Sequence, residues 1–299
     1  MMSVVMLGTG GSTPTKDRGL PSVVVSHEGN SYMFDCGEGT QMQMLKYGVS
    51  SSRIKCIFIS HIHGDHVIGL AGLVRSMALN NRTAVLYIFV PKSYEKSLDA
   101  LMTFDKALIR YPLKIVGMKN GSVFSDKGVD VRAFKLNHSI ETLGFSISEH
   151  DKRNFQKKKC DALGIKGPMF SRLTKKGSIK IGKKIVLLND VTTLRKGIKL
   201  VYATDTRPTA ETLKAARDCN LLIHESTYSD SEAKLASERK HSTAVEAAQI
   251  AKKAKAKELI LTHISARYTD HTKLLNEARK IFKNTQIAKD GQTVELKEA

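Results

Sequence analysis

The chain of 299 residues contains no tryptophan, four cysteines, six prolines and no long apolar run. A membrane span needs roughly 18 consecutive apolar residues, and residues 1–11 lack the charged start and long apolar stretch of a signal peptide. The cysteines are scattered without a CxxC pair, which argues against a disulfide framework or a cysteine zinc site. These absences predict a cytoplasmic protein with reduced thiols and no membrane partner.

Acidic residues are also scarce, with 29 Asp and Glu against 48 Lys and Arg, which gives a net charge of +19. Such an excess predicts a polyanionic partner. The charge is concentrated, because residues 151–199 contain 15 Lys or Arg against 3 Asp, a net charge of +12. Glycines and a weak helical period predict that this segment is a partly irregular basic arm, inserted in a single domain of residues 1–299.

Short runs rich in β-branched residues, separated by turn-forming residues, predict many strands. In the first half they span residues 4–7, 22–26, 32–34, 56–59, 85–90, 129–136 and 144–148, so the first third is expected to be mostly β. In the second half, strands at 199–203, 221–224 and 258–262 alternate with helices at 210–219 and 243–257. A capping box of Thr243 and Glu246 opens the last helix. This order predicts an α/β fold, an αββα sandwich of two facing sheets with helices outside.

The segment SHIHGDH, residues 60–66, places His61, His63, Asp65 and His66 directly after a predicted strand. Alternate residues of an extended chain point the same way, so His61 and His63 can face one metal ion while Asp65 and His66 turn toward another. A lone histidine is more often a satisfied core residue. Four metal-competent side chains in six positions instead predict half of a two-metal site.

A two-metal site needs further ligands and usually a bridging carboxylate. His138, Asp205 and His263 each follow an apolar run. Ligands presented at strand ends are held rigidly by the sheet behind them. These three residues are therefore the candidates that complete the site.

The order HxHxDH, then histidine, aspartate and histidine resembles the ligand order of the metallo-β-lactamase superfamily, whose fold is this αββα sandwich. The sequence further resembles the ribonuclease Z family, the tRNA 3′-processing endonucleases, over nearly its full length. The resemblance lies in eight blocks in the family's order: MLGTGGSTPTKDRGLPS, FDCGEGTQMQ, SHIHGDH, NHSIETLGFSISE, YATDTRP, HESTYSD, HSTAVEAAQIA and THISARY. Two departures are Gly19, where the family typically has asparagine, and Ala266, where serine is frequent.

The resemblance implies two Zn²⁺ per subunit and a role for each candidate residue. His61, His63 and His138 would hold one zinc, and Asp65, His66 and His263 the other, with Asp205 between them. Asp65 would also accept a proton from the attacking water. His241 would protonate the leaving 3′ oxygen, and Glu225 would orient His241 and raise its pKa. Asp35 is expected to orient a metal-bound histidine from behind.

The resemblance also implies precursor tRNA as substrate and a homodimer in which one subunit's arm serves the other's active site. Lys157, Lys158 and Lys159 of the arm are expected to contact tRNA phosphates. Lys16, Arg18, Arg267 and Tyr268 are candidates for contacts near the tRNA end. Hydrolysis by water, rather than attack by a ribose 2′-OH, predicts a 3′-OH on the tRNA and a 5′-phosphate on the trailer.

Three alternatives stay open. The first is a general metal-dependent phosphodiesterase or RNA-end nuclease of the same superfamily without tRNA preference. The second is a thioesterase or lactamase-type hydrolase of small acyl substrates, against which the basic arm argues. The third is an RNA-binding protein on an inactive hydrolase scaffold, against which the complete set of seven candidate ligands argues.

Overall fold

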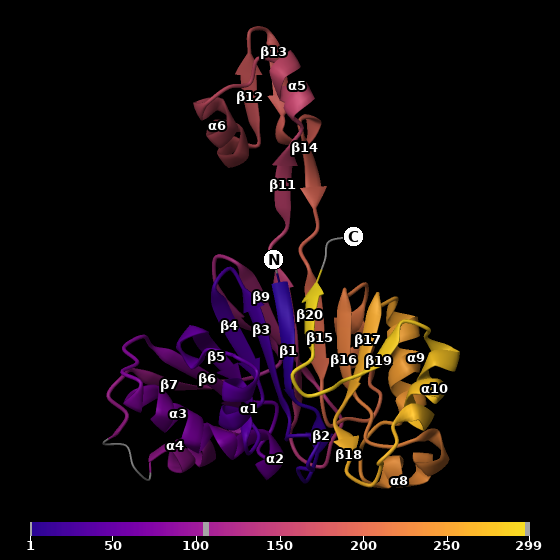
Figure 1. Cartoon of the computed structure of the whole chain (residues 1–299). Helices are drawn as coiled ribbons and strands as arrows, with labels where there is room; N and C mark the ends of the chain where they lie inside the picture. The colour runs from indigo at the N-terminus through magenta and orange to yellow at the C-terminus, as the bar shows by residue number, and fades with distance from the viewer. Residues whose placement is uncertain (1, 104–107, 297–299) are drawn as a thin grey trace. The chain divides into compact units, whose positions relative to one another are not determined.

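The computed structural model describes residues 2–103 and 108–296. It separates into two units (Figure 1). The first unit comprises the chain up to residue 148 and again from residue 198, and the second is Glu149–Gly197. No helix among the described residues is long and apolar enough to cross a membrane.

The first sheet of the larger unit has seven strands in the order β20-β1-β3-β4-β5-β6-β7. β3 and β4 form a hairpin whose two turn residues, Glu28 and Gly29, both have positive φ, as a tight hairpin turn requires. From β4 to β7 the strands run parallel. Their bounds are β1 Met2–Gly8, β3 Ser22–His27, β4 Asn30–Phe34, β5 Ile54–Phe58, β6 Leu86–Pro91, β7 Leu113–Met118 and β20 Thr293–Leu296.

The second sheet has seven strands in the order β19-β17-β16-β15-β10-β9-β8. Four of them, β15, β16, β17 and β19, are parallel neighbours. Successive side chains of a strand alternate between faces, and in β16 Leu221 and Ile223 face the other sheet while Leu222 faces the helices. The bounds are β8 Gly121–Ser125, β9 Val129–Lys135, β10 Leu143–Glu149, β15 Lys199–Ala203, β16 Leu221–Glu225, β17 Glu258–Thr262 and β19 Thr285–Ile287.

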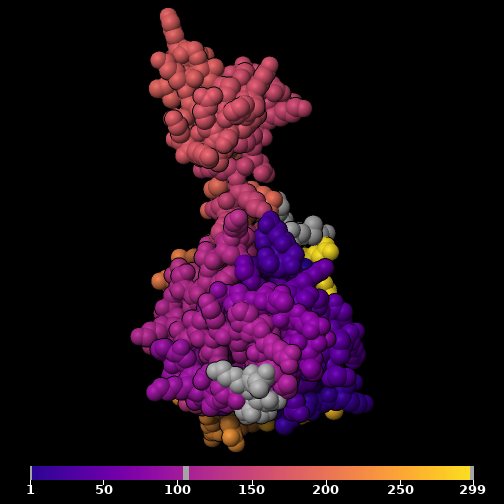
Figure 2. Space-filling model, turned by 90° about the vertical axis from the view of Figure 1, so that its left-hand side faces the viewer, coloured from indigo at the N-terminus to yellow at the C-terminus, as the bar shows by residue number. Residues whose placement is uncertain are grey.

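Helices cover the outer face of each sheet, which confirms the predicted αββα sandwich (Figure 1). The first sheet is covered by α1 Thr40–Lys46, α3 Gly69–Leu79 and α4 Glu95–Thr103. The second is covered by α7 Ala210–Ala216, α9 Ala244–Ala254 and α10 Thr272–Ile281. The Thr243–Glu246 capping box is present at the start of α9. Residues of the first half, indigo to magenta, form most of the face of the larger unit shown in Figure 2.

The prediction that the first third is mostly β is wrong, because that stretch also contains α1, α2 Gly64–Val67 and α3. Glycines disfavour helix interiors, and α3 starts at Gly69 and contains Gly72. Its apolar positions Leu70, Leu73, Val74 and Met77 nevertheless follow the helical spacing and are buried against the sheet. Tertiary packing thus stabilises a helix that its glycines disfavour.

Aromatic rings fill the space between the two sheets. Phe58 stacks on Phe34 at 5.3 Å and on Phe89 at 4.9 Å between ring centroids. Phe145 of the opposite sheet lies 5.7 Å from Phe58, and Tyr202 lies 6.1 Å from Phe34. Close packing of large rings makes this layer a rigid support for the loops at the strand ends.

The second unit is more regular than the predicted partly irregular arm. β11 Lys152–Phe155 pairs with β14 Thr192–Arg195, and β12 Ser178–Ile181 pairs with β13 Lys184–Leu187. Two short helices, α5 Lys157–Ala162 and α6 Pro168–Lys176, complete it. The unit has a small core of its own, made of Cys160, Ile165, Leu173, Val186 and Val191. Because short turns interrupt these elements, none is long enough to show a clear period in the sequence.

Candidate metal centre

The seven candidate ligands lie in loops and one short helix at the ends of strands from both sheets. His61 and His63 follow β5, and Asp65 and His66 belong to α2. The remaining three, which follow β9, β15 and β17 respectively, are His138, Asp205 and His263. Their ligand atoms gather into groups within which all atoms lie within 4.8 Å of one another. Residues up to two hundred positions apart in the sequence therefore meet at one edge of the sandwich.

The first group consists of His61, His63, His138 and Asp205. His63 Nδ1 lies 2.9 Å from His61 Nε2 and 3.3 Å from His138 Nε2. Asp205 Oδ2 lies 3.7 Å from both His61 Nε2 and His138 Nε2. Three imidazole nitrogens and one carboxylate oxygen thus converge, which is a donor set that suits a divalent transition metal.

The second group consists of Asp65, His66 and His263, with the other oxygen of Asp205. Asp65 Oδ2 lies 3.5 Å from both His66 Nε2 and His263 Nε2. Asp205 Oδ1 lies 3.3 Å and 3.2 Å from the same two nitrogens. The two oxygens of Asp205 therefore face different groups, as a bridging carboxylate between two ions does.

Two buried nitrogens in this second group have no hydrogen-bond partner among the residues that the structure describes. They are His66 Nε2 and His263 Nε2. A buried polar atom without a partner is costly, and a metal ion is the partner that an unprotonated imidazole nitrogen surrounded by carboxylates would take. The residues present therefore fit a pair of divalent cations.

Asp35 lies behind the centre and orients two of its histidines. Its Oδ2 accepts hydrogen bonds from His66 Nδ1 (2.8 Å), Ser60 Oγ (3.0 Å) and Tyr202 Oη (2.9 Å). Because the Ser60 hydroxyl donates to Asp35, it accepts from His61 Nδ1 at 2.9 Å. Protonation at Nδ1 leaves Nε2 of both imidazoles available as a ligand atom. Asp35 therefore contacts a candidate ligand from behind, as expected. Ser60 and Tyr202 also hydrogen-bond to Asp35, and the sequence analysis did not identify them.

The other histidines are held in the same way by groups that sequence reasoning missed. Thr227 Oγ1 donates to Glu225 Oε2 (2.7 Å) and so accepts from His263 Nδ1 (2.9 Å). His138 Nδ1 donates to the carbonyl of Lys240 (3.2 Å). No spacing rule finds these partners, because Thr227 belongs to the loop after β16 and Lys240 contributes only its backbone.

His241 and Glu225 form an ion pair at the border of the centre. His241 Nδ1 lies 2.9 Å from Glu225 Oε1, and Glu225 is fully buried. Burial lowers the pKa of His241, but the charge of Glu225 and its hydrogen bond outweigh burial and raise that pKa to about 9. Burial raises the pKa of Glu225, but His241 and further groups lower it to about 2. One ring nitrogen of His241 lies within 4.8 Å of ligand atoms of Asp205 and His263.

Arg18, a candidate for a tRNA contact, is mostly buried and lines a pocket with Lys16. Its side chain is buried, and its Nη1 donates to Thr9 Oγ1 (2.6 Å) and to the carbonyl of Ala288 (2.8 Å). Its Nε lies 3.3 Å from His271 Nε2. These contacts join the N-terminal loop to the C-terminal segment, so Arg18 also has a structural role in the fold.

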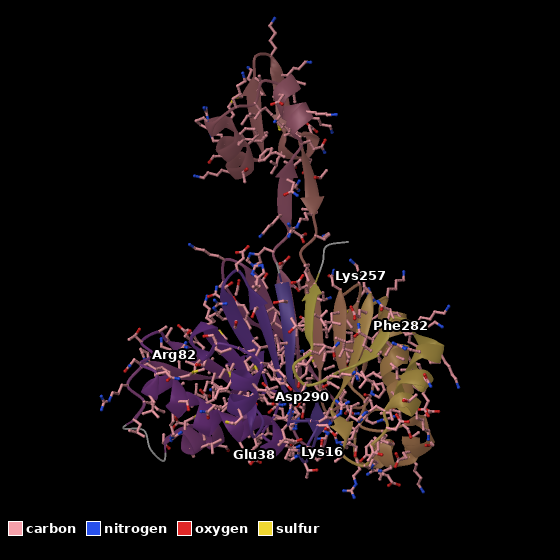
Figure 3. The ribbon with its side chains drawn as sticks, in the orientation of Figure 1. Lys16, Glu38, Arg82, Lys257, Phe282 and Asp290 are labelled. Atoms are coloured by element: carbon pink, nitrogen blue, oxygen red, sulfur yellow. The ribbon has the colours of Figure 1, made fainter. Side chains whose placement is uncertain are left out.

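The remaining substrate candidates are accessible. Lys16 is exposed and lines a pocket of about 440 Å³ together with Glu38 and Asp290 (Figure 3). Arg267 pairs with Glu232 at 2.5 Å and lies over the ring of Tyr228, and the Tyr268 hydroxyl donates to Glu232. The three arm lysines, all exposed in α5 of the second unit, are Lys157, Lys158 and Lys159.

A family model described as Anti-Pycsar protein Apyc1 matches residues 2–156, and one described as Beta-lactamase superfamily domain matches residues 191–264. Ribonuclease Z of Methanosarcina acetivorans is 38% identical over 300 residues, which cover 99% of this chain and 98% of that protein. Ribonuclease Z of Gemmatimonas aurantiaca is 42% identical over 301 residues, which cover 98% and 95%. The crystal structure of human tRNase Z, short form, matches with a TM-score of 0.71 and 26% identity over 99% of both chains.

The αββα sandwich and its cluster of histidines and aspartates define a metal-dependent hydrolase of the β-lactamase superfamily. The Apyc1 model stops at residue 156, whereas the ribonuclease Z relatives align over nearly the whole chain, the basic second unit included. The chain belongs to the ribonuclease Z family.

Proposed function

We propose that this protein is an endoribonuclease that removes the 3′ trailer from precursor tRNA by hydrolysis. The tRNA would keep a 3′-OH and the trailer would carry a 5′-phosphate. The observation that carries the proposal is the convergence of six candidate ligands around a seventh, Asp205, in a chain that aligns with ribonuclease Z relatives from end to end. We propose that the protein is cytoplasmic, because an enzyme of this kind must meet precursor tRNA. Its four free cysteines also suit a reducing compartment.

The metal that the site is proposed to hold is zinc, two ions per subunit. His61, His63 and His138 would hold one ion with Asp205 Oδ2, and Asp65, His66 and His263 the other with Asp205 Oδ1. Five imidazoles and no thiolate favour Zn²⁺ among the divalent metals, although the second group offers more oxygen than the first. Bound cations of this kind lower the pKa of water toward about 7 and neutralise charge on a phosphoryl group.

The protein's own residues are proposed to move the protons. Asp65 Oδ2 accepts the Ser12 backbone N–H at 2.8 Å, which orients its carboxylate, and Asp65 would accept a proton from the attacking water. The charge of Glu225 and its hydrogen bond raise the pKa of His241, which favours the protonated ring. His241 is therefore suited to donate a proton to the 3′ oxygen as the P–O3′ bond breaks.

The substrate contacts are proposed for the exposed basic residues. The lysine-rich α5 would contact tRNA phosphates, which gives affinity with little sequence readout. Arg267 and Tyr268 belong to the segment that follows His263, so they would meet the phosphate or base nearest the cleavage point. Lys16 would contact the acceptor stem from its pocket. Arg18, which lines the same pocket, would contribute to this contact, and its Nη1 also holds Thr9 and Ala288.

A homodimer is proposed through the outer face of α1 and α3. Met42, Leu45 and Leu79 are 67%, 73% and 73% exposed, and Leu45 and Leu79 line one apolar groove between these helices. In a chain of net charge +19, α1 and α3 together contain two basic residues, Lys46 and Arg75. Two copies would repel each other little at this face and would bury exposed apolar side chains there. Changing Leu45 and Leu79 to glutamate should give a monomer in analytical ultracentrifugation, and an unchanged species would exclude this interface.

The function is tested by mapping the ends of the products from a precursor tRNA, beside an unstructured RNA with the same 3′ trailer. Cleavage of the tRNA alone, with a 3′-OH and a 5′-phosphate, is the expected result. Equal cleavage of both RNAs would favour the general nuclease. A 2′,3′-cyclic phosphate would contradict hydrolysis by water.

A further inference from the structure

The turn that carries His241 is held by an ion pair outside the metal centre. Arg207 Nη1 donates to the carbonyl oxygen of His241 (2.6 Å) and to Glu246 Oε2 (2.8 Å). Its Nη2 donates to the other carboxylate oxygen of Glu246. The pair is therefore bidentate, the arrangement in which the planar guanidinium has least freedom to turn.

Both members of the pair are fixed at their own ends. The Arg207 N–H donates to the carbonyl of Asn137 (2.9 Å), directly before His138. Glu246 Oε2 also accepts the Thr243 N–H (2.9 Å) in the capping box of α9. The side chains of Arg207 and Glu246 are each 21% exposed, so solvent screens the pair only in part. The pair thus joins the ends of β9 and β15 to the start of α9 around His241.

The backbone of this turn has a conformation that needs support. Lys240 has a φ of 57°, in the left-handed region that favours glycine. The carbonyl of Lys240 accepts from His138 Nδ1, and the carbonyl of His241 accepts from Arg207. The His241 N–H donates to the carbonyl of Ala236 (2.8 Å). Arg207 therefore supplies the one side-chain contact to the backbone of His241 among those that the structure describes.

We propose that Arg207 and Glu246 are positioning residues that set the place of the His241 imidazole relative to the leaving 3′ oxygen. The inference rests on the proposed proton transfer from His241. In that step water forms the new P–O bond, the P–O3′ bond breaks, and the His241 proton goes to the departing oxygen. Glu225 fixes the ring at Nδ1, and Arg207 fixes the backbone from which the ring projects. Without the contact from Arg207, the His241 imidazole would keep its ion pair with Glu225, but the backbone that positions the ring would no longer be fixed.

The test compares two substrates of the metal-loaded, full-length enzyme: a precursor tRNA and bis(p-nitrophenyl) phosphate. The p-nitrophenolate leaving group is stable as an anion, so its departure needs little help from an acid. For His241→Ala, kcat on the tRNA should fall by about 100-fold, within the usual contribution of a general acid. For Arg207→Met it should fall by at least about 10-fold, with KM changed by less than about twofold, because the acid is displaced and tRNA binding is not. Neither change should alter hydrolysis of the small phosphodiester by more than about twofold.

Two variants and one control separate positioning from general damage. Glu246→Gln retains an acceptor for the Thr243 N–H but loses the charge of the pair, and should show the same selective loss. Arg207→Lys retains one donor for the His241 carbonyl and should recover part of the lost kcat. Lys55→Met, which breaks a 2.6 Å ion pair with Asp126 elsewhere in the unit, should change neither substrate. Metal content is measured on every sample, because the turn also holds His138.

The outcomes distinguish the inference from the function on which it rests. Full tRNA cleavage by both Arg207→Met and Glu246→Gln would overturn the inference. Equal loss on both substrates with full metal content would overturn it as well, because the residues would then support the whole centre. If His241→Ala itself loses both activities equally, the assignment of the acid is wrong, and the positioning role is refuted with it.

Discussion

Changing Lys157, Lys158 and Lys159 together to glutamine is expected to weaken binding of precursor tRNA. Consecutive residues of a helix are about 100° apart, so these three side chains spread over about 200° of the surface of α5 and cannot all follow one row of phosphates. Lys159 Nζ also donates to the carbonyl of Asp190 (3.2 Å). Two phosphate contacts are therefore the expected loss.

The size of the effect follows from counterion release. Each phosphate contact contributes about 0.7 to 0.9 to the slope of log K against log salt, so two contacts reduce the slope by about 1.4 to 1.8. Over a fourfold change in salt, the affinity difference between the native chain and the triple variant should shrink by about 7- to 12-fold. Loss of stability should not contribute, because α5 has no acidic residue in its first turn and cations at a helix N-terminus are unfavourable.

The assay is equilibrium binding of precursor tRNA between about 50 and 200 mM KCl, the range in which phosphate contacts are lost. His241→Ala is introduced into every protein to prevent cleavage. The matched control changes three exposed lysines of the larger unit to glutamine. Lys252 and Lys253 lie in the last turn of α9, and Lys257 follows that helix. An equal change of slope in this control would show that net charge, not the second unit, holds the tRNA. The reasoning would also be refuted if the arm variant lost small-phosphodiester hydrolysis to the same extent as tRNA binding.

Asp205→Asn removes the charge that both groups share, and metal measured by mass spectrometry should fall well below two ions per chain; retention of both would exclude a bridging role. Asp35→Ala leaves His66 Nδ1 without its acceptor and should weaken metal affinity by about 10- to 100-fold in a chelator competition. Unchanged affinity would mean that this contact does not orient the ligand. Phe145→Ala opens a cavity between the sheets and should lower the free energy of unfolding by about 3–5 kcal/mol in urea denaturation of the metal-loaded enzyme. A loss below about 1 kcal/mol would indicate that the ring layer closes around the gap.

The cluster of candidate ligands was predictable where its information is local. SHIHGDH contains four candidate ligands in six positions, and His138, Asp205 and His263 each follow an apolar strand, so both patterns can be recognised in the sequence alone. The alternation of β15, β16 and β17 with helices likewise predicted the second sheet. Which aspartate oxygen faces which group, by contrast, depends on the backbone of Asp205, whose φ is positive.

Other features depend on long-range packing that no local pattern shows. Arg18 stands in an exposed-looking loop of Gly, Thr and Lys, but Ala288 and His271, more than two hundred residues away in the chain, bury it. Glu246 was visible only as a capping residue, because its pairing with Arg207 joins segments 39 residues apart. Basic residues interrupted by glycines predicted an irregular arm, because the small core of Cys160, Leu173 and Val186 joins segments that are separated in the sequence.

The central claim is that one carboxylate joins two metal ions at the edge of the sandwich. Anomalous diffraction at the zinc edge, from crystals of the metal-loaded protein, tests it most directly. Two peaks are predicted, one among His61, His63 and His138 and the other among Asp65, His66 and His263, with Asp205 between them. A single peak, or peaks away from Asp205, would contradict the account.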